Sequence, residues 1–141
     1  MTWYADNSIC DYFPFPEHES LRAIGWLERG HEFTTGSVEP EVYDRLEELL
    51  RDPWQPVVCA GPHECDLCRF RQDTVGSANL FVPGDGVVFV CPELILHYIN
   101  AHEYAPPREF CSAVLSCPNT RSMEYKKALL KSGLNIGELT R

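Results

Sequence analysis

The sequence is short of basic residues: 12 Lys and Arg stand against 21 Asp and Glu, which gives a formal net charge of -9. A protein field of this sign repels phosphate backbones, so general binding to nucleic acid is disfavoured. Long apolar runs are also missing, because no stretch approaches the ~18 apolar residues of a membrane span. The first residues contain neither the basic nor the apolar segment of a signal peptide. We therefore expect a cytoplasmic protein that does not enter a membrane.

Common catalytic motifs are missing as well. The sequence has no H-E-x-x-H, and Gly84-Asp85-Gly86 has neither the glycine pattern nor the lysine of a phosphate-binding loop. The pair His63-Glu64 before Cys65 only faintly matches zinc deaminases, whose second Cys segment is absent. We assign no catalytic and no cofactor-binding residue, and expect a protein that is not an enzyme. A Cys–His nucleophile formed in space stays open.

Length and composition indicate an ordinary globular domain. The chain has 141 residues, of which 44% are hydrophobic and 23% charged, enough to build a core without disulfide staples. We expect one α+β domain over 1–141. Its predicted parts are an extended aromatic arm (1–16), a helical segment (17–54), a metal knuckle with a hairpin and a helix (55–104), and C-terminal helices (105–141).

The helical segment is expected to hold two helices. Leu21, Ile24 and Leu27 share one helical face over 17–29, with Gly30 as the stop. The second helix begins at Pro40 and ends before Asp52-Pro53. Its apolar stripe consists of Val42, Leu46, Leu49 and Leu50.

The rest of the chain alternates strand and helix signals. A short strand is predicted over 55–60, and the β-rich runs 79–82 and 87–91 predict a hairpin around Pro83-Gly84-Asp85-Gly86. A helix then runs from Pro92 to about His102. Two more are predicted over 107–116 and from an N-cap at Ser122 to Ser132.

Seven cysteines are present, at positions 10, 59, 65, 68, 91, 111 and 117. An odd number in a cytoplasmic chain argues against a disulfide framework. Only Cys65 and Cys68 form the close pair C-x2-C. The other five receive no role from the sequence.

The close cysteine pair has two histidines behind it. Cys65, Cys68, His97 and His102 follow the pattern C-x2-C-x28-H-x4-H, with the hairpin between the pairs and both histidines on the predicted helix. Two thiolates and two imidazoles satisfy the tetrahedral preference of Zn²⁺. The spacing therefore predicts a structural, treble-clef-like zinc site in which no coordination position is left for water. Replacing either cysteine by Ser should then unfold the C-terminal part, because metal-binding energy is folding energy.

The spacing of the histidines raises a geometrical objection. Residues five apart on a straight α-helix are separated by roughly 140° of rotation. We expect the helix to fray or turn 3₁₀ near Asn100–His102; if it stays regular, His63 would replace His102 as the reserve ligand. A buried reduced thiol pair beside two ordinary histidines, an iron site and a redox dithiol remain alternatives.

The motifs resemble those of a family of small uncharacterised bacterial proteins. The matching segments are Ala23–His31, Gly61–Cys68 as G-x-H-x-C-x2-C, and Pro92–Pro107 with H-Y-I-x2-H-x-Y-x-P-P. The resemblance implies that the C-x2-C and H-x4-H residues form a site common to the family. It implies no activity.

Three kinds of function are compatible with a zinc site. The first is a non-enzymatic module of regulatory, adaptor or toxin-neutralising type that binds a protein partner with a basic surface, because residues 1–62 hold 12 acids against 4 bases. The second is a zinc hydrolase with an open site and Glu64 or Glu93 as general base. The third, ranked last, is a zinc finger that binds nucleic acid, since helix 92–102 has no Lys or Arg.

Overall fold

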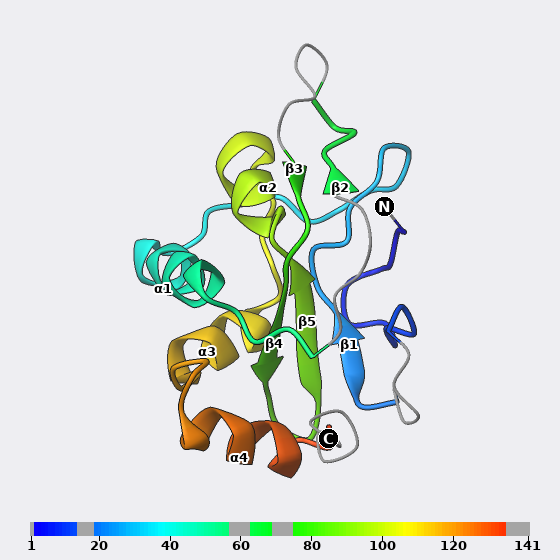
Figure 1. The fold of residues 1–141 in the computed structure, drawn as a ribbon. Helices are drawn as coiled ribbons and strands as arrows, with labels where there is room; N and C mark the ends of the chain where they lie inside the picture. Colours follow the sequence, from blue (N-terminus) through cyan, green and yellow to red (C-terminus); the bar gives the residue numbers. More distant parts are fainter. Residues whose placement is uncertain (1, 14–18, 57–62, 69–74, 135–141) are drawn as a thin grey trace.

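The computed structural model describes residues 2–13, 19–56, 63–68 and 75–134 (Figure 1). Its elements are β1 (Leu21–Ala23), α1 (Pro40–Arg51), β2 (His63–Glu64), β3 (Val75–Gly76), β4 (Asn79–Pro83), β5 (Val88–Pro92), α2 (Ile95–His102), α3 (Arg108–Ser116) and α4 (Met123–Lys131). The described part of the chain is thus α+β, as the sequence predicts, and it holds four helices and a small mixed sheet.

The main sheet has the strand order β1-β5-β4. β4 and β5 form the predicted antiparallel hairpin, in which Phe81 is opposite Val90. β1 adds to the other edge of β5 in parallel, with Leu21 beside Val88. Both hairpin strands are almost wholly buried, so the sheet forms the centre of the core.

The helix predicted over 17–29 is wrong. Residues 21–23 form β1, a strand whose backbone bonds with β5 on one side and with the N-terminal arm on the other. Leu21, Ile24 and Leu27 are all buried, so their three-residue spacing reflects burial from several sides rather than one helical face. Gly25, at φ 75°, also interrupts any helix there. Long-range pairing has overridden the local pattern.

The sequence predicts an extended, docked aromatic arm over 1–16. The described part of this arm, residues 2–13, is extended and docked on the domain. The N–H of Cys10 donates to the carbonyl of Leu21 at 3.1 Å, and the N–H of Ala23 donates to Ser8 at 2.9 Å. Tyr4 meets the ring of Trp26 edge to face. The arm therefore extends the sheet beyond β1.

The remaining predictions divide into three outcomes. Helix α1 has the predicted stripe, since Val42, Leu46, Leu49 and Leu50 are buried, and α3 and α4 lie where they were expected. The N-cap of α4 is confirmed, because the Ser122 hydroxyl accepts from the N–H of Tyr125. Helix α2 begins at Ile95, later than the predicted Pro92. The strand predicted over 55–60 lies mostly outside the described residues.

The helices are distributed unevenly around the sheet (Figure 1). Helices α1, α3 and α4 lie on the β4 side, and all three contact β4. Helix α2 lies at the opposite end of the molecule from α4, beside the small β2–β3 pair. This arrangement places the cysteine knuckle and the histidine helix at one end of the fold.

Candidate metal centre

The two cysteines follow directly after β2, which pairs antiparallel with β3. Two contacts fix this knuckle to the loop after β1. The Asp66 carboxylate accepts from the backbone N–H of Arg29 at 3.2 and 3.3 Å, and the Arg29 guanidinium donates to the carbonyl of Cys68 at 3.4 Å. The loop after β1 therefore holds the knuckle in place.

The two histidines come from α2, which is anchored by the buried side chains of Ile95 and Tyr98. Glu103 ends the helix in a left-handed conformation, with φ 57°, and its N–H donates to the carbonyl of Tyr98. The next residue, Tyr104, is buried and donates its hydroxyl to Asp6 at 2.8 Å. Core packing thus sets the position of α2 relative to the knuckle.

The four side chains converge on one point. Their ligand atoms all lie within 4.8 Å of one another. The Cys65 and Cys68 sulfurs are 3.7 Å apart. The Nε2 atom of His102 lies 3.4 Å from the Cys65 sulfur and 3.5 Å from that of Cys68, and Nε2 of His97 lies 3.2 Å from the Cys68 sulfur.

These separations can be compared with those of a tetrahedral zinc site. With Zn–S near 2.3 Å and Zn–N near 2.0 Å, tetrahedral angles place two sulfurs about 3.8 Å apart and a sulfur and a nitrogen about 3.5 Å apart. The sulfur–sulfur distance and the three sulfur–nitrogen distances given above lie within a few tenths of an ångström of these values, and the remaining pairs of ligand atoms lie within 4.8 Å. The cluster thus has the donor set and the dimensions of a site that can hold a metal ion.

The predicted fraying or 3₁₀ turn near Asn100–His102 is wrong, and so is the objection that a regular helix would keep His102 out of the cluster. Helix α2 is α-helical through His102, yet His102 joins the cluster. The imidazole rings of His97 and His102 reach beyond the helix surface, and their centroids lie 5.1 Å apart. Because an imidazole carries Nε2 well away from Cβ, two side chains on different faces can meet at a point beside the helix.

Burial at the cluster affects its thiols and imidazoles differently. Cys65 is buried, whereas Cys68, His97 and His102 are half-buried. Burial raises the pKa of the Cys65 thiol. Burial, followed by the charge of His102, lowers the pKa of His97. Burial thus favours the neutral form of His97, which is the form that binds a metal, and disfavours the Cys65 thiolate, which a bound cation would favour.

The sequence also suggested His63 as a reserve ligand and Glu64 and Glu93 as general bases. The side chain of His63, the reserve ligand, lies outside the described residues. Glu93, one of two proposed general bases, accepts from the N–H of Ser77 at 3.2 Å, and Glu64 is exposed. Neither glutamate belongs to the metal-ligating group found among the described residues.

Two supporting residues were missed by sequence reasoning. Asp66 and Arg29 hold the knuckle but lie far apart in sequence, so no spacing rule pairs them. The only available signal was the acidic residue inside C-x2-C, because a carboxylate in a tight turn commonly accepts from backbone N–H groups.

Comparisons with known proteins give a family and nothing closer. One family model matches residues 2–115, and its description is "Domain of unknown function (DUF7919)". The matched range includes all four cluster residues and excludes α4. No curated protein and no solved structure matches the chain. Separately, no helix among the described residues is long and apolar enough to cross a membrane.

Proposed function

Because the chain belongs to the DUF7919 family, whose description assigns no function, we propose a function from its own residues: it is a small zinc-stabilised module that acts by binding a protein partner. The observation that carries the proposal is the Cys65, Cys68, His97 and His102 cluster, whose donor distances match a tetrahedral site. All four positions are filled by side chains. A site of this kind holds a fold together and leaves no position for a reactive water.

The proposed ion links segments that are distant in the chain. It joins the knuckle after β2 to α2, with the β4–β5 hairpin between them, in a treble-clef-like order. Zn²⁺ suits two thiolates and two imidazoles better than hard cations, which prefer oxygen ligands. Since two thiolates neutralise the ion, the net charge of the protein stays near -9.

The metal part of the proposal is tested by elemental analysis and Co²⁺ substitution. We expect one zinc per chain in the purified, untagged protein, and the visible spectrum of tetrahedral S₂N₂ cobalt after exchange. Cys68→Ser should lose both, whereas Cys111→Ser should retain them, because Cys111 is half-buried on α3 away from the cluster. Absence of metal, with unchanged thermal stability after chelation, would refute the zinc site.

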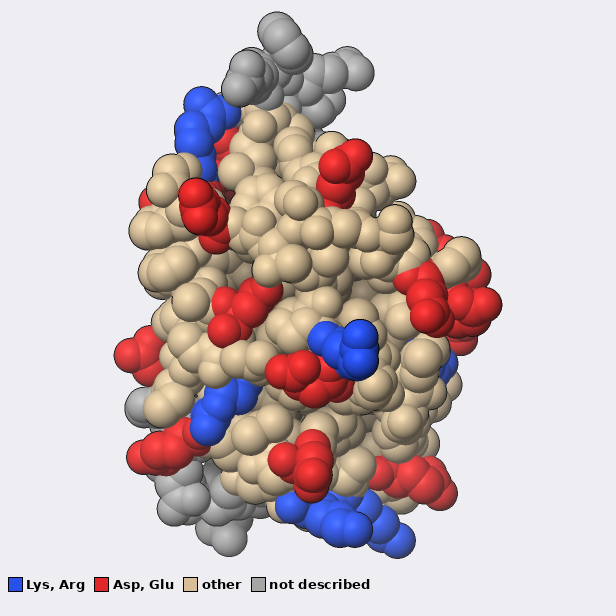
Figure 2. Space-filling view, turned by 180° about the vertical axis from the view of Figure 1, so that it is seen from behind, with Lys and Arg blue, Asp and Glu red and all other residues tan. Residues whose placement is uncertain are grey.

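The charge distribution supports a basic partner. Acidic side chains are dispersed over the face seen in Figure 2, while the most continuous basic group lies at the lower edge. A hollow of about 560 Å³ between α1 and α2 is lined by Asp44, Glu103 and Tyr43. Carboxylates beside an aromatic ring suit the side chain of a Lys or Arg. We place the partner's basic group here, in a regulatory, adaptor or toxin-neutralising interaction.

The proposal of a basic protein partner is tested with a purified partner. That partner is first identified by quantitative capture from the native proteome. Its affinity should fall roughly tenfold in Glu41→Gln/Asp44→Asn, since both acids are exposed on α1, and should fall with added salt. Glu124→Gln, which removes an exposed acid from α4, is the matched control. A partner that binds all three proteins equally and without salt dependence would contradict this surface.

A further inference from the structure

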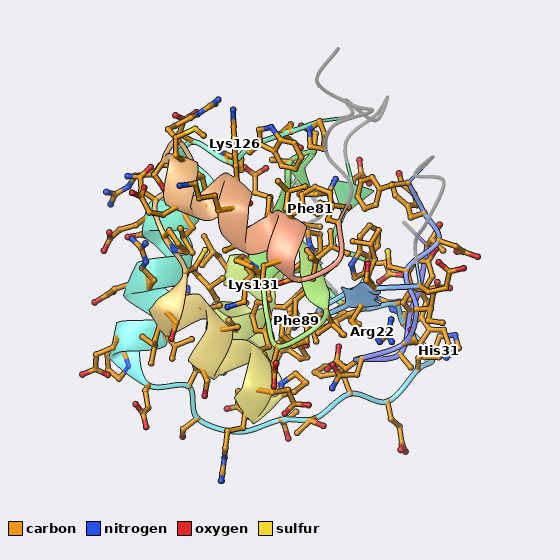
Figure 3. The ribbon with its side chains drawn as sticks, turned by 90° about the horizontal axis from the view of Figure 1, so that it is seen from below. Arg22, His31, Phe81, Phe89, Lys126 and Lys131 are labelled. Carbon is orange, nitrogen blue, oxygen red and sulfur yellow. The ribbon has the colours of Figure 1, made fainter. Side chains whose placement is uncertain are left out.

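A second hollow lies at the end of the molecule opposite the cysteine–histidine cluster. Its volume is about 1040 Å³, and its walls come from β1, the β4–β5 turn, α3 and α4. Figure 3 looks onto this end, with Phe89 and Lys131 close together and Arg22 at the side. We call it the α3–α4 groove. Its volume lies at the upper end of the range for small-molecule sites.

Three basic side chains line the groove in a protein with net charge -9: Arg22, Arg108 and Lys131. They come from β1, α3 and α4, so folding, and not sequence proximity, brings them to one hollow. Elsewhere Arg45, Arg51 and Arg121 form ion pairs with carboxylates. No described carboxylate forms an ion pair with any of the three groove cations.

The guanidinium of Arg22 is already held in place. It donates to the backbone carbonyls of Glu19 and Leu21, which fixes it at the edge of β1 and leaves further N–H groups for a ligand. Such positioning lowers the entropy lost when a ligand binds. Arg108 and Lys131 are exposed and can adjust to it.

Two carboxylates also line the groove, Asp85 and Glu109. Glu109 is engaged, since its Oε1 accepts from the amide of Asn7 at 2.8 Å. Among the described residues that line the groove, the three cations exceed the two carboxylates by one charge. This described lining thus has the opposite sign from the protein as a whole.

Part of the groove lining is apolar. Phe89, Val87, Pro83 and Ala113 all line it. Phe89 is held by an edge-to-face contact with Phe110, at a centroid distance of 5.7 Å. A lining that combines apolar side chains with cations matches a ligand that has an apolar body and an anionic head.

We propose that the α3–α4 groove binds a small organic anion, with its carboxylate or phosphate group held by Arg22, Arg108 and Lys131 and its apolar part against Phe89. Guanidinium groups bind both oxyanions through paired N–H donors. The groove and the metal cluster share no residue, so either proposal can fail without the other.

The test is an NMR titration of the isotope-labelled protein, as purified, at constant ionic strength. Three probes share a phenyl ring and differ in charge: phenyl phosphate, phenylacetate and the cation phenethylamine. We expect saturable shifts of amides in 84–89 and 108–116 with at least one anion, and none with the cation. The stronger anion identifies the head group. No shifts with either anion, or equal shifts with all three probes, would overturn the proposal.

Variants locate the anion. Arg108→Gln/Lys131→Gln changes two exposed side chains and should weaken the bound anion at least roughly tenfold, because charge-assisted hydrogen bonds are the strong ones. Lys126→Gln is the matched control: it removes a charge from α4, and Figure 3 shows Lys126 on the other side of that helix from Phe89 and Lys131. Equal affinity in the double variant and the control would also overturn the assignment.

Discussion

The imidazole rings of His97 and His102 lie with their centroids 5.1 Å apart and nearly perpendicular, although the two residues are on different faces of a regular α-helix. The geometry of the helix alone does not bring both rings to the Cys68 sulfur. They meet it because the knuckle lies beside the helix, where Asp66 and Arg29 hold it. The cluster therefore depends on tertiary packing as much as on the four ligands.

The first prediction concerns the two histidines. His97→Ala and His102→Ala each remove one of four donors, so zinc affinity should fall by more than the roughly 10–100-fold typical of losing a residue that only supports a ligand. Competition with a chromophoric chelator measures the change. His31→Ala is the control, because His31 stacks on Trp3 at 4.0 Å and takes no part in the cluster. Unchanged affinity in His102→Ala would show that His102 is not a ligand.

The second prediction concerns where stability is lost without metal. Helices α3 and α4 pack on β4, so Cys68→Ser should expose the backbone of α2 and the knuckle while α3 and α4 stay protected. This prediction is narrower than the one made from the sequence, in which the whole C-terminal part unfolds. Hydrogen exchange resolved by segment measures it. Uniform loss of protection across α2, α3 and α4 would favour the broader expectation.

Local patterns were sufficient for most of the fold and for the four residues of the cysteine–histidine cluster. Turn residues around Gly84-Asp85-Gly86 predicted the β4–β5 hairpin, and the stripe on α1 predicted its buried face. The C-x2-C and H-x4-H spacings brought out the four residues that converge. The hairpin and the stripe are local features, and the cysteine and histidine spacings follow from the ligands that Zn²⁺ prefers.

The predictions that were wrong concern features that depend on contacts between distant segments. The strand at Leu21 exists because β5 and the arm supply its hydrogen-bond partners, and no pattern within 17–29 reports them. The convergence of His97 and His102 likewise depends on where the knuckle lies. A rotation angle on an isolated helix therefore misjudged the site.

The third prediction compares two glycines with positive φ. A Cβ added at Gly25, with φ +75°, would lie 3.1 Å from Cγ1 of Ile95 at the start of α2. At Gly30, with φ +96°, a Cβ would meet nothing within 4 Å. Gly30→Ala should therefore cost about 1–2 kcal/mol from backbone strain alone. Gly25→Ala should cost roughly 1–3 kcal/mol more from crowding.

Denaturant unfolding of the zinc-loaded protein measures both glycine variants. Crowding at Ile95 moves the start of α2, so Gly25→Ala should also weaken zinc binding, while Gly30→Ala should not. Equal destabilisation by the two substitutions would mean that Ile95 gives way without cost.

The last prediction concerns the pH dependence of stability at Asp6. Its carboxylate accepts from the N–H of Gly25 at 3.0 Å and from the Tyr104 hydroxyl at 2.8 Å. Burial outweighs both bonds and raises its pKa above the ordinary value of 3.8. The folded state therefore holds this proton more tightly than the unfolded state does. The stabilisation due to Asp6 is complete below 3.8 and is lost as the pH rises through the folded pKa.

Asp6→Asn removes this titration and keeps an oxygen that can accept from Gly25. The variant should therefore gain stability relative to the native protein as the pH rises from about 4 towards neutrality: the difference in free energy of unfolding, variant minus native, should increase. Chemical unfolding at several pH values measures the difference, from which every contribution common to both proteins cancels, including that of the proposed zinc. Glu19→Gln, at an exposed position on the turn before β1, is the matched control for the loss of one negative charge. A difference for Asp6→Asn that does not vary with pH would mean that its two hydrogen bonds fully offset the cost of burying the charge.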